Sequence, residues 1–236
     1  MQPIMESQVN RRLTGGRVHS VMKKKDRIIA KVKSRYWRTT HKFGIRLPKT
    51  VEEALRIDDE TGTDFWRKAI GREMSKVKVA WRSNDKFSPD DVRQGKASDM
   101  IGFQEIKCHI IFYVKMDFTR KARFVAVEHM TETPGLITYS SVVSRDSVRL
   151  AFLIAGLNEL DVLAGDVTLA YLNAPCREKI WFEGQVENGD ERGKVLIVTR
   201  ALYGLKSSGA AWRAEFAGTL QDMGFVSTKA DPDVWI

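Results

Sequence analysis

Hydrophobic and polar positions follow a helical period over four stretches of this 236-residue chain. Between Thr63 and Val79, apolar side chains recur every three or four positions and charged side chains occupy the opposite side. A shorter helix is expected from Val51, with Thr50 as its N-cap. Two more helices are expected, over 144–158 and over 210–223.

Runs of β-branched and aromatic residues predict strands. Asp117-Phe118-Thr119 joins the first two runs into a predicted hairpin, whereas the polar segment Ser83–Met100 is typical of a loop. Together with the helices, this pattern predicts an α/β (α+β) fold with a mixed or antiparallel sheet and packed helices. The predicted strands are Glu105–Met116, Arg120–His129, Lys179–Phe182 and Lys194–Val198.

One further strand is expected through Leu163–Leu172, and it contains a carboxylate, Asp166, among apolar neighbours. We expect the helix over 144–158 to pack under this strand. A buried carboxylate is costly unless a cation or several donors meet it, and a metal ion is such a cation. The alternative is that Asp166 caps a helix that starts near Thr168.

The composition is that of a globular protein, with 43% hydrophobic and 29% charged residues. No run approaches the roughly 18 apolar residues of a membrane span, so we expect no membrane partner. The two cysteines, Cys108 and Cys176, lie far apart and predict neither a disulfide framework nor a metal site. A reducing intracellular location is expected, in a cytoplasmic particle or the nucleus.

The positive charge is concentrated at the N-terminus. Residues 1–50 contain 14 Lys and Arg against 2 acidic residues, while the remainder contains 25 against 28. We therefore expect two parts: a basic, partly disordered extension or linker over 1–50, and a folded domain over 51–236. A basic segment attracts phosphate backbones, although a solvated linker has the same composition. The candidate nucleic-acid-binding residues are Lys23, Lys24, Lys25 and Arg27.

Four sequence blocks resemble the motifs of one protein family and occur in the order found in that family. The segment Asp166–Leu172 reads Asp-Val-Thr-Leu-Ala-Tyr-Leu, and Ala201–Trp212 contains Leu-Tyr-Gly-Leu-Lys followed by a tryptophan. Upstream are Arg120–Ala126, with Lys-Ala-Arg-Phe-Val-Ala, and the block Tyr139–Arg149. In this order the blocks resemble the reverse transcriptases of copia-type retrotransposons.

The resemblance implies the fingers and the first half of the palm of a right-hand polymerase. The implied activity is RNA-directed DNA polymerisation with two Mg²⁺ ions, for which Asp166 and the backbone carbonyl of Val167 would be ligands. The family's second carboxylate pair, in a Tyr-Val-Asp-Asp hairpin, would follow Ile236. We therefore expect the isolated chain to be inactive.

The resemblance also assigns nucleotide-binding roles. Lys121 and Arg123 would bind the triphosphate, although each could be an ordinary exposed strand charge. Tyr171 would exclude a ribose 2′-hydroxyl, unless it is a packed core residue. The loop expected to cradle the nucleotide and the templating base contains Tyr203, Gly204 and Lys206.

The implied partners are an RNA or DNA template–primer, dNTPs, and the rest of a polyprotein that includes integrase and ribonuclease H. Two alternatives remain at this point. The chain could be a non-catalytic nucleic-acid-binding remnant of a decayed element, or a structural α/β protein with chance matches.

Overall fold

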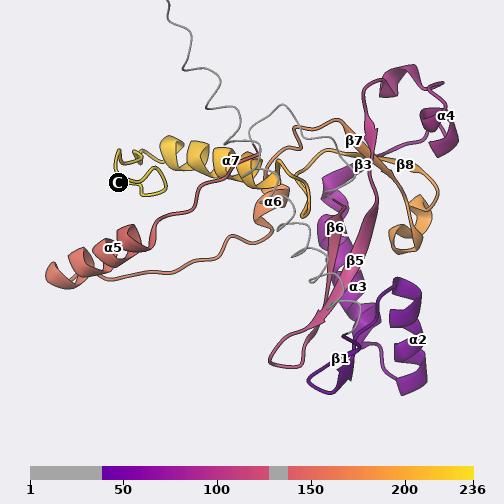
Figure 1. The fold of residues 1–236 in the computed structure, drawn as a ribbon, viewed down its shortest axis with the longest axis horizontal. Coiled ribbons are helices and arrows are strands. Elements are labelled where there is room, and N and C mark those ends of the chain that lie inside the picture. The colour runs from indigo at the N-terminus through magenta and orange to yellow at the C-terminus, as the bar shows by residue number, and fades with distance from the viewer. Residues whose placement is uncertain (1–38, 128–137) are drawn as a thin grey trace, which may run out of the picture.

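The structure is a computed structural model that describes residues 39–127 and 138–236. It is a mixed α/β fold (Figure 1). No helix within these ranges is long and apolar enough to cross a bilayer. In chain order the elements are β1 (His41–Lys42), β2 (Ile45–Arg46), α2 (Val51–Thr61), α3 (Phe65–Val77), η1 (Lys78–Ala80), β3 (Trp81–Asn84), α4 (Pro89–Arg93), η2 (Ser98–Met100), β4 (Gln104–Glu105), β5 (Cys108–Val114), β6 (Arg120–Ala126), α5 (Arg145–Leu157), α6 (Ala170–Asn173), β7 (Ile180–Glu183), η4 (Val186–Glu191), β8 (Val195–Val198) and α7 (Ser208–Asp222).

Local capping sets the start of α2, as predicted. The Thr50 hydroxyl accepts a hydrogen bond from the Glu53 N–H at 3.1 Å. The start of α3 is different, because Asp64 makes no capping hydrogen bond with its side chain. Asp58, on α2 and only 1% exposed, instead accepts from the N–H groups of Trp66 at 3.2 Å and Arg67 at 2.8 Å. A carboxylate from one helix therefore caps the next.

The β5–β6 hairpin forms as predicted, with Cys108 opposite Ala126 and Val114 opposite Arg120. A second sheet has the order β3-β8-β7-β4, in which β4 and β7 are parallel and the other neighbours antiparallel. The predicted strands at β7 and β8 are confirmed. The loop prediction for 83–100 is wrong, because this range contains the end of β3 and the short helix α4.

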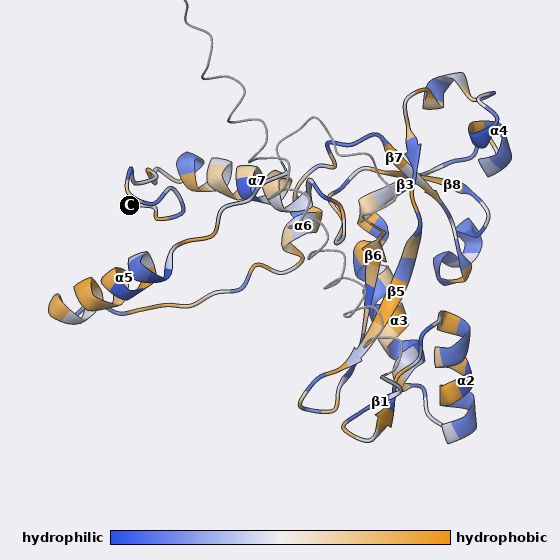
Figure 2. Ribbon diagram, viewed as in Figure 1, coloured by the Kyte–Doolittle hydropathy of each residue, from blue (hydrophilic) through white to orange (hydrophobic). Residues whose placement is uncertain are grey.

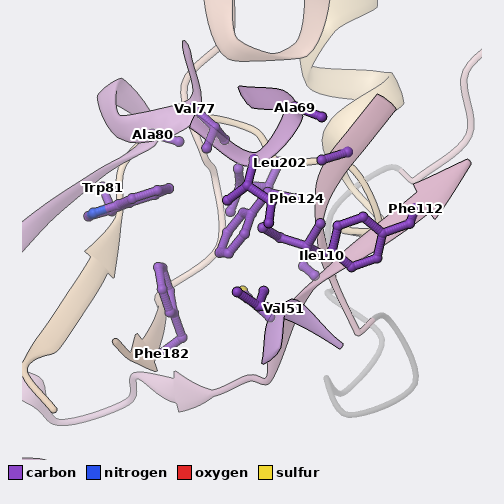
Figure 3. Packing of buried hydrophobic residues seen from close by; sticks show 14 of the residues in the cluster. Val51, Ala69, Val77, Ala80, Trp81, Ile110, Phe112, Phe124, Phe182 and Leu202 are labelled. Carbon is purple, nitrogen blue, oxygen red and sulfur yellow. The ribbon is translucent and has the colours of Figure 1, made fainter. Parts of the chain in front are cut away.

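Three aromatic rings join the two sheets. Trp81 on β3, Phe124 on β6 and Phe182 on β7 have ring centroids 5.4–5.7 Å apart, and all three are buried (Figure 3). Aromatic pairs at these distances contribute about 0.5–1.5 kcal/mol beyond the area that they bury. The hairpin is thereby held against the four-stranded sheet, with α3 packed on the hairpin.

The prediction for the region around Asp166 is wrong. Residues 158–167 form no strand, and α5 buries none of its residues. Figure 1 shows α5 and the segment that follows it extending away from the two sheets, and Figure 2 shows how apolar this helix is. Strand propensity needs a neighbouring strand for its hydrogen bonds, and no described strand lies beside this segment.

A hydrogen-bonded contact does link the start of α5 to the C-terminal turn. The carboxylate of Asp231 accepts from the Ser147 hydroxyl at 2.6 Å and the Ser144 N–H at 2.9 Å. These hydrogen bonds lower the pKa of Asp231 to about 2. The helix start predicted at Ser144 is confirmed, since its hydroxyl caps the N–H of Ser147.

We predict that Asp58→Ala lowers the free energy of unfolding by about 2 kcal/mol, because the buried N–H of Trp66 and the partly buried N–H of Arg67 lose their acceptor. The measurement is urea denaturation of the full chain. Asp59→Ala is the matched control, since Asp59 is exposed and its carboxylate forms a surface ion pair with Arg67. The control should change stability by less than about 0.5 kcal/mol. Equal effects of the two substitutions would contradict the cap assignment.

Candidate functional site

A cavity of about 320 Å³ lies between α3, β6 and the turn that leads into α6. Its walls bring together Asp166, Val167, Lys121, Arg123 and Tyr203, which come from three distant parts of the sequence. Asp166 is exposed to solvent, so its carboxylate is available to a ligand. The cavity therefore combines the carboxylates of Asp166 and Glu73 with the cations of Lys76, Lys121 and Arg123.

Arg123 is oriented by an aromatic stack. Its guanidinium carbon lies 4.5 Å from the ring centroid of Tyr203, a favourable cation–π distance. The Tyr203 ring in turn lies 4.8 Å from the ring of Tyr171. Tyr171 packs against a small cluster of buried alanines and is not a wall residue of the cavity. Tyr171 thus contacts the Tyr203 ring, and Tyr203 in turn contacts Arg123.

The turn at Gly204 is pressed against the edge of β6. The N–H of Ala126 donates to the carbonyl oxygen of Tyr203 at 2.8 Å. Gly204 has a φ of +93°, and a Cβ there would lie 2.1 Å from the carbonyl oxygen of Ala126. Only glycine fits this approach, which holds Tyr203 beside Arg123.

A second turn positions Asp166. Leu169 has a φ of +57°, which is rare and unfavourable for leucine. Its partly buried side chain packs against the main core and holds the turn in place. α6 then begins without a side-chain capping hydrogen bond, so the alternative in which Asp166 caps this helix is wrong.

The described residues alone do not form a two-metal site. Within 39–127 and 138–236 there is no group of three or more His, Cys, Asp or Glu side chains that could hold a metal ion. Asp166 and the carbonyl of Val167 offer oxygen ligands of the kind that Mg²⁺ prefers, but Mg²⁺ needs near-octahedral coordination. Further carboxylates would have to come from elsewhere.

Comparisons with known proteins identify the family of this chain. The family described as reverse transcriptase (RNA-dependent DNA polymerase) matches residues 98–236, more than half of the chain. The chain belongs to this reverse transcriptase family.

Two curated relatives support the copia-type resemblance of this reverse transcriptase segment. The retrovirus-related Pol polyprotein from transposon TNT 1-94 of Nicotiana tabacum is 26% identical over 201 residues, which are 80% of this chain and 14% of that polyprotein. The corresponding polyprotein from transposon RE2 of Arabidopsis thaliana is 26% identical over 200 residues, 80% of this chain and 12% of the relative. The chain thus spans about an eighth of these relatives, and no solved structure matches it.

The structure of the reverse transcriptase segment brings five of the twelve predicted site residues to one cavity. Lys121, Arg123 and Tyr203 share the cavity of Asp166, and Gly204 fixes the adjoining turn. Lys206 is partly exposed just before α7 and does not line this cavity. The predicted nucleic-acid-binding residues Lys23, Lys24, Lys25 and Arg27 lie outside the described residues, and their roles stay predictions, as does the domain boundary near residue 50.

Sequence reasoning missed two wall residues, Glu73 and Lys76 on α3. The helical pattern assigned both to the solvent side of an amphipathic helix. The Glu73 carboxylate accepts a hydrogen bond from the Phe124 N–H at 3.0 Å, beside the cavity. No local signal could have revealed this contact, because the two residues are 51 positions apart.

We predict that Gly204→Ala displaces the Tyr203 turn and destabilises the fold by more than about 1 kcal/mol, because the added methyl group meets backbone and the φ is left-handed. Urea denaturation measures the loss, and near-ultraviolet circular dichroism reports the Tyr171–Tyr203 stack. Gly218→Ala in α7 is the control, since nothing lies within 4 Å of a Cβ there. It should stabilise the protein by up to about 1 kcal/mol. A Gly204→Ala variant with unchanged stability would contradict the close approach of the Gly204 turn to β6.

Proposed function

We propose that this chain contributes the nucleotide-binding wall and one metal-binding carboxylate to an RNA-directed DNA polymerase. In this proposal α3 and the β5–β6 hairpin are the fingers, and the turn with Asp166, together with α6, belongs to the palm. The observation that supports it best is the single cavity shared by Asp166, Lys121, Arg123 and Tyr203. A carboxylate facing fixed cations suits a metal-bound triphosphate better than a neutral ligand.

The triphosphate would lie against Lys121, Arg123 and Lys76. Phosphoryl transfer leaves little covalent work to the protein, so catalysis depends on positioning and on stabilising charge. Arg123 is suited to this because its guanidinium already lies over the Tyr203 ring, and a planar guanidinium can bind two phosphate oxygens at once. Tyr203 would therefore be a positioning residue for Arg123.

Asp166 would be one of several carboxylates at a two-metal site. Bound Mg²⁺ ions would stabilise the charge on the attacking and leaving oxygens. Among the described residues, the carboxylates at this cavity are Asp166 and Glu73, and Glu73 accepts the Phe124 N–H, so the proposal requires the second pair from a Tyr-Val-Asp-Asp segment elsewhere in the polyprotein.

Tyr171 would restrict the sugar indirectly in this proposal. Its ring supports Tyr203 from behind, and Tyr203 forms the cavity wall. A smaller residue at position 171 would allow Tyr203 to retreat and enlarge the space beside the nucleotide. The resemblance implies that Tyr171 excludes the ribose 2′-hydroxyl directly, whereas in this proposal the exclusion acts through Tyr203.

We predict that Asp166→Asn, in a longer polyprotein product that includes the Tyr-Val-Asp-Asp hairpin, lowers Mg²⁺-dependent DNA synthesis on a primed RNA template by more than about a hundredfold. The expected size follows from the several kcal/mol that a metal ion contributes to the transition state. Asp161→Asn is the control, because Asp161 lies on the same exposed segment but outside the cavity. Its synthesis should stay within about twofold of the unmodified enzyme. Equal loss in both variants would refute the assignment of Asp166.

The 236-residue chain assayed alone should give no Mg²⁺-dependent primer extension, since Asp166 without the family's second carboxylate pair leaves a two-metal site incomplete. The same primed RNA template, with all four dNTPs, provides the measurement. The longer product is the positive control. Clear extension by the chain alone would show that its own residues complete the site.

A further inference from the structure

The outward edge of β6 is held from outside the hairpin at two alternate positions. The N–H of Phe124 donates to Oε1 of Glu73 at 3.0 Å, and the N–H of Ala126 donates to the Tyr203 carbonyl at 2.8 Å. In an antiparallel pair, alternate residues turn their N–H groups outward, and the residues between them bond to the partner strand. Arg123 therefore bonds into the hairpin through its own backbone, while its neighbour Phe124 bonds to α3.

The backbone of Glu73 is fixed by the buried face of α3. Ala69, Ile70 and Val77 lie three or four positions away along the helix, and each is at most 9% exposed. The helix packs on β6. The Glu73 side chain is partly buried and lies in the wall of two cavities, one of about 320 Å³ and one of about 180 Å³. It thus links a rigid helix to the edge of a strand.

The carboxylate of Glu73 lies among basic side chains but does not pair with them. Lys76, Lys121 and Arg123 line the same cavity, yet neither Glu73 nor Arg123 forms an ion pair within 39–127 and 138–236. A hydrogen bond to an ionised acceptor is about twice as strong as a neutral one, so the contact with the Phe124 N–H is strong. The charge of Arg123 stays available to an anionic ligand.

The Phe124 N–H does not need a side chain merely to be satisfied. The contact is only partly buried and lies at a cavity wall, so a water molecule could accept from this N–H almost as well. A water molecule, however, would not hold β6 at a fixed distance from α3. The contribution of Glu73 is therefore geometric.

Arg123 is the residue whose position this link affects most directly. Its guanidinium carbon lies 4.5 Å from the ring centroid of Tyr203, and two-point binding of phosphate depends on that orientation. A displacement of about 1 Å in a positioned group can lower a rate about a hundredfold. Without Glu73, only the hydrogen bond at Ala126 would remain of the two that hold this edge.

We infer that Glu73 is a positioning residue for Arg123. By accepting the Phe124 N–H, it holds β6 at a fixed distance from α3, so that the guanidinium lies over Tyr203 at the cavity of Asp166. The inference rests on the proposed function, in which Arg123 binds the triphosphate. Loss of Glu73 then weakens nucleotide binding only as far as it displaces Arg123.

The first test compares Glu73→Ala with Glu73→Gln in the longer polyprotein product that includes the Tyr-Val-Asp-Asp hairpin. Incorporation of one nucleotide on a primed RNA template gives kcat and the KM for the dNTP. Glu73→Ala should raise this KM about tenfold, whereas Glu73→Gln keeps a carbonyl acceptor and should stay within about threefold. Glu60→Ala is the control, since Glu60 is exposed on α2 and pairs with Arg46 at the surface. It should change the KM less than about twofold.

A double-mutant cycle separates positioning from a purely structural role. Because Glu73 acts through Arg123, Glu73→Ala should add less than about twofold to the KM once Arg123→Ala is present. A purely structural role predicts instead that the two effects multiply. Glu73→Met keeps the length of the side chain without a strong acceptor, so it should match Glu73→Ala and replaces it if the alanine variant folds poorly.

Amide hydrogen exchange of the 236-residue chain tests the link without nucleotide or synthesis. Glu73→Ala should speed exchange at Phe124 about tenfold or more, whereas Ala126, whose N–H donates to Tyr203, should stay within about threefold of its rate. Urea denaturation of the same variants identifies global unfolding, which would speed exchange at both positions.

The inference alone is overturned if Arg123→Ala raises the KM and Glu73→Ala does not, or if the two effects multiply in the double variant. Equal losses in Glu73→Gln and Glu73→Ala overturn it too, because the charge of Glu73 and not its acceptor would then matter. An unchanged exchange rate at Phe124 has the same consequence. A longer product that makes no DNA, or an Arg123→Ala variant with an unchanged KM, refutes the proposed function and the inference with it.

Discussion

The hydrogen bond from the Ala126 N–H to the Tyr203 carbonyl is the contact on which the candidate site depends. It joins two segments that are 77 positions apart, and it forms only because Gly204 has no side chain to meet the Ala126 carbonyl. Once it forms, Tyr203 lies over Arg123 on one side and against Tyr171 on the other. A single backbone contact therefore orders a cation, two rings and a cavity wall.

The free edge of β6 extends this organisation toward the hairpin tip. Successive outward N–H groups of a strand recur every two residues, and here each meets a different neighbour. Ala126 meets the Tyr203 turn, Phe124 meets the Glu73 carboxylate, and Ala122 lines a second cavity together with Lys76 and Lys121. One face of the hairpin is occupied by core packing, in which Phe124 contacts Trp81 and Phe182. Core packing thus fixes the position of β6, and the hydrogen bonds at the edge of β6 position the residues of the candidate site.

Features that depend on neighbours in sequence could be predicted, and those that depend on distant partners could not. The caps at Thr50 and Ser144 and the β5–β6 hairpin follow from local patterns, and the structure contains them. The cap of α3 by Asp58 comes from another helix and carries no local signal. The motif residues Arg123 and Tyr203 were expected at one site from family resemblance, whereas their stacking is a tertiary contact. The strand expected through Asp166 is not formed for the same reason. The strand propensity of these residues does not provide a neighbouring strand with which to pair.

The position of Asp166 is set from one side only. Toward the C-terminus it is held by the packed turn at Leu169, but toward the N-terminus the chain runs exposed to α5, with Leu163 95% exposed and Phe152 60% exposed. Large apolar surfaces of this kind mark places where another segment packs. A metal ligand must also be held to within about 0.5 Å to be effective. In the proposed function, another segment must therefore pack against α5 and the exposed chain that follows it. The same packing would fix the position of the Asp166 carboxylate, because this chain leads directly to Asp166.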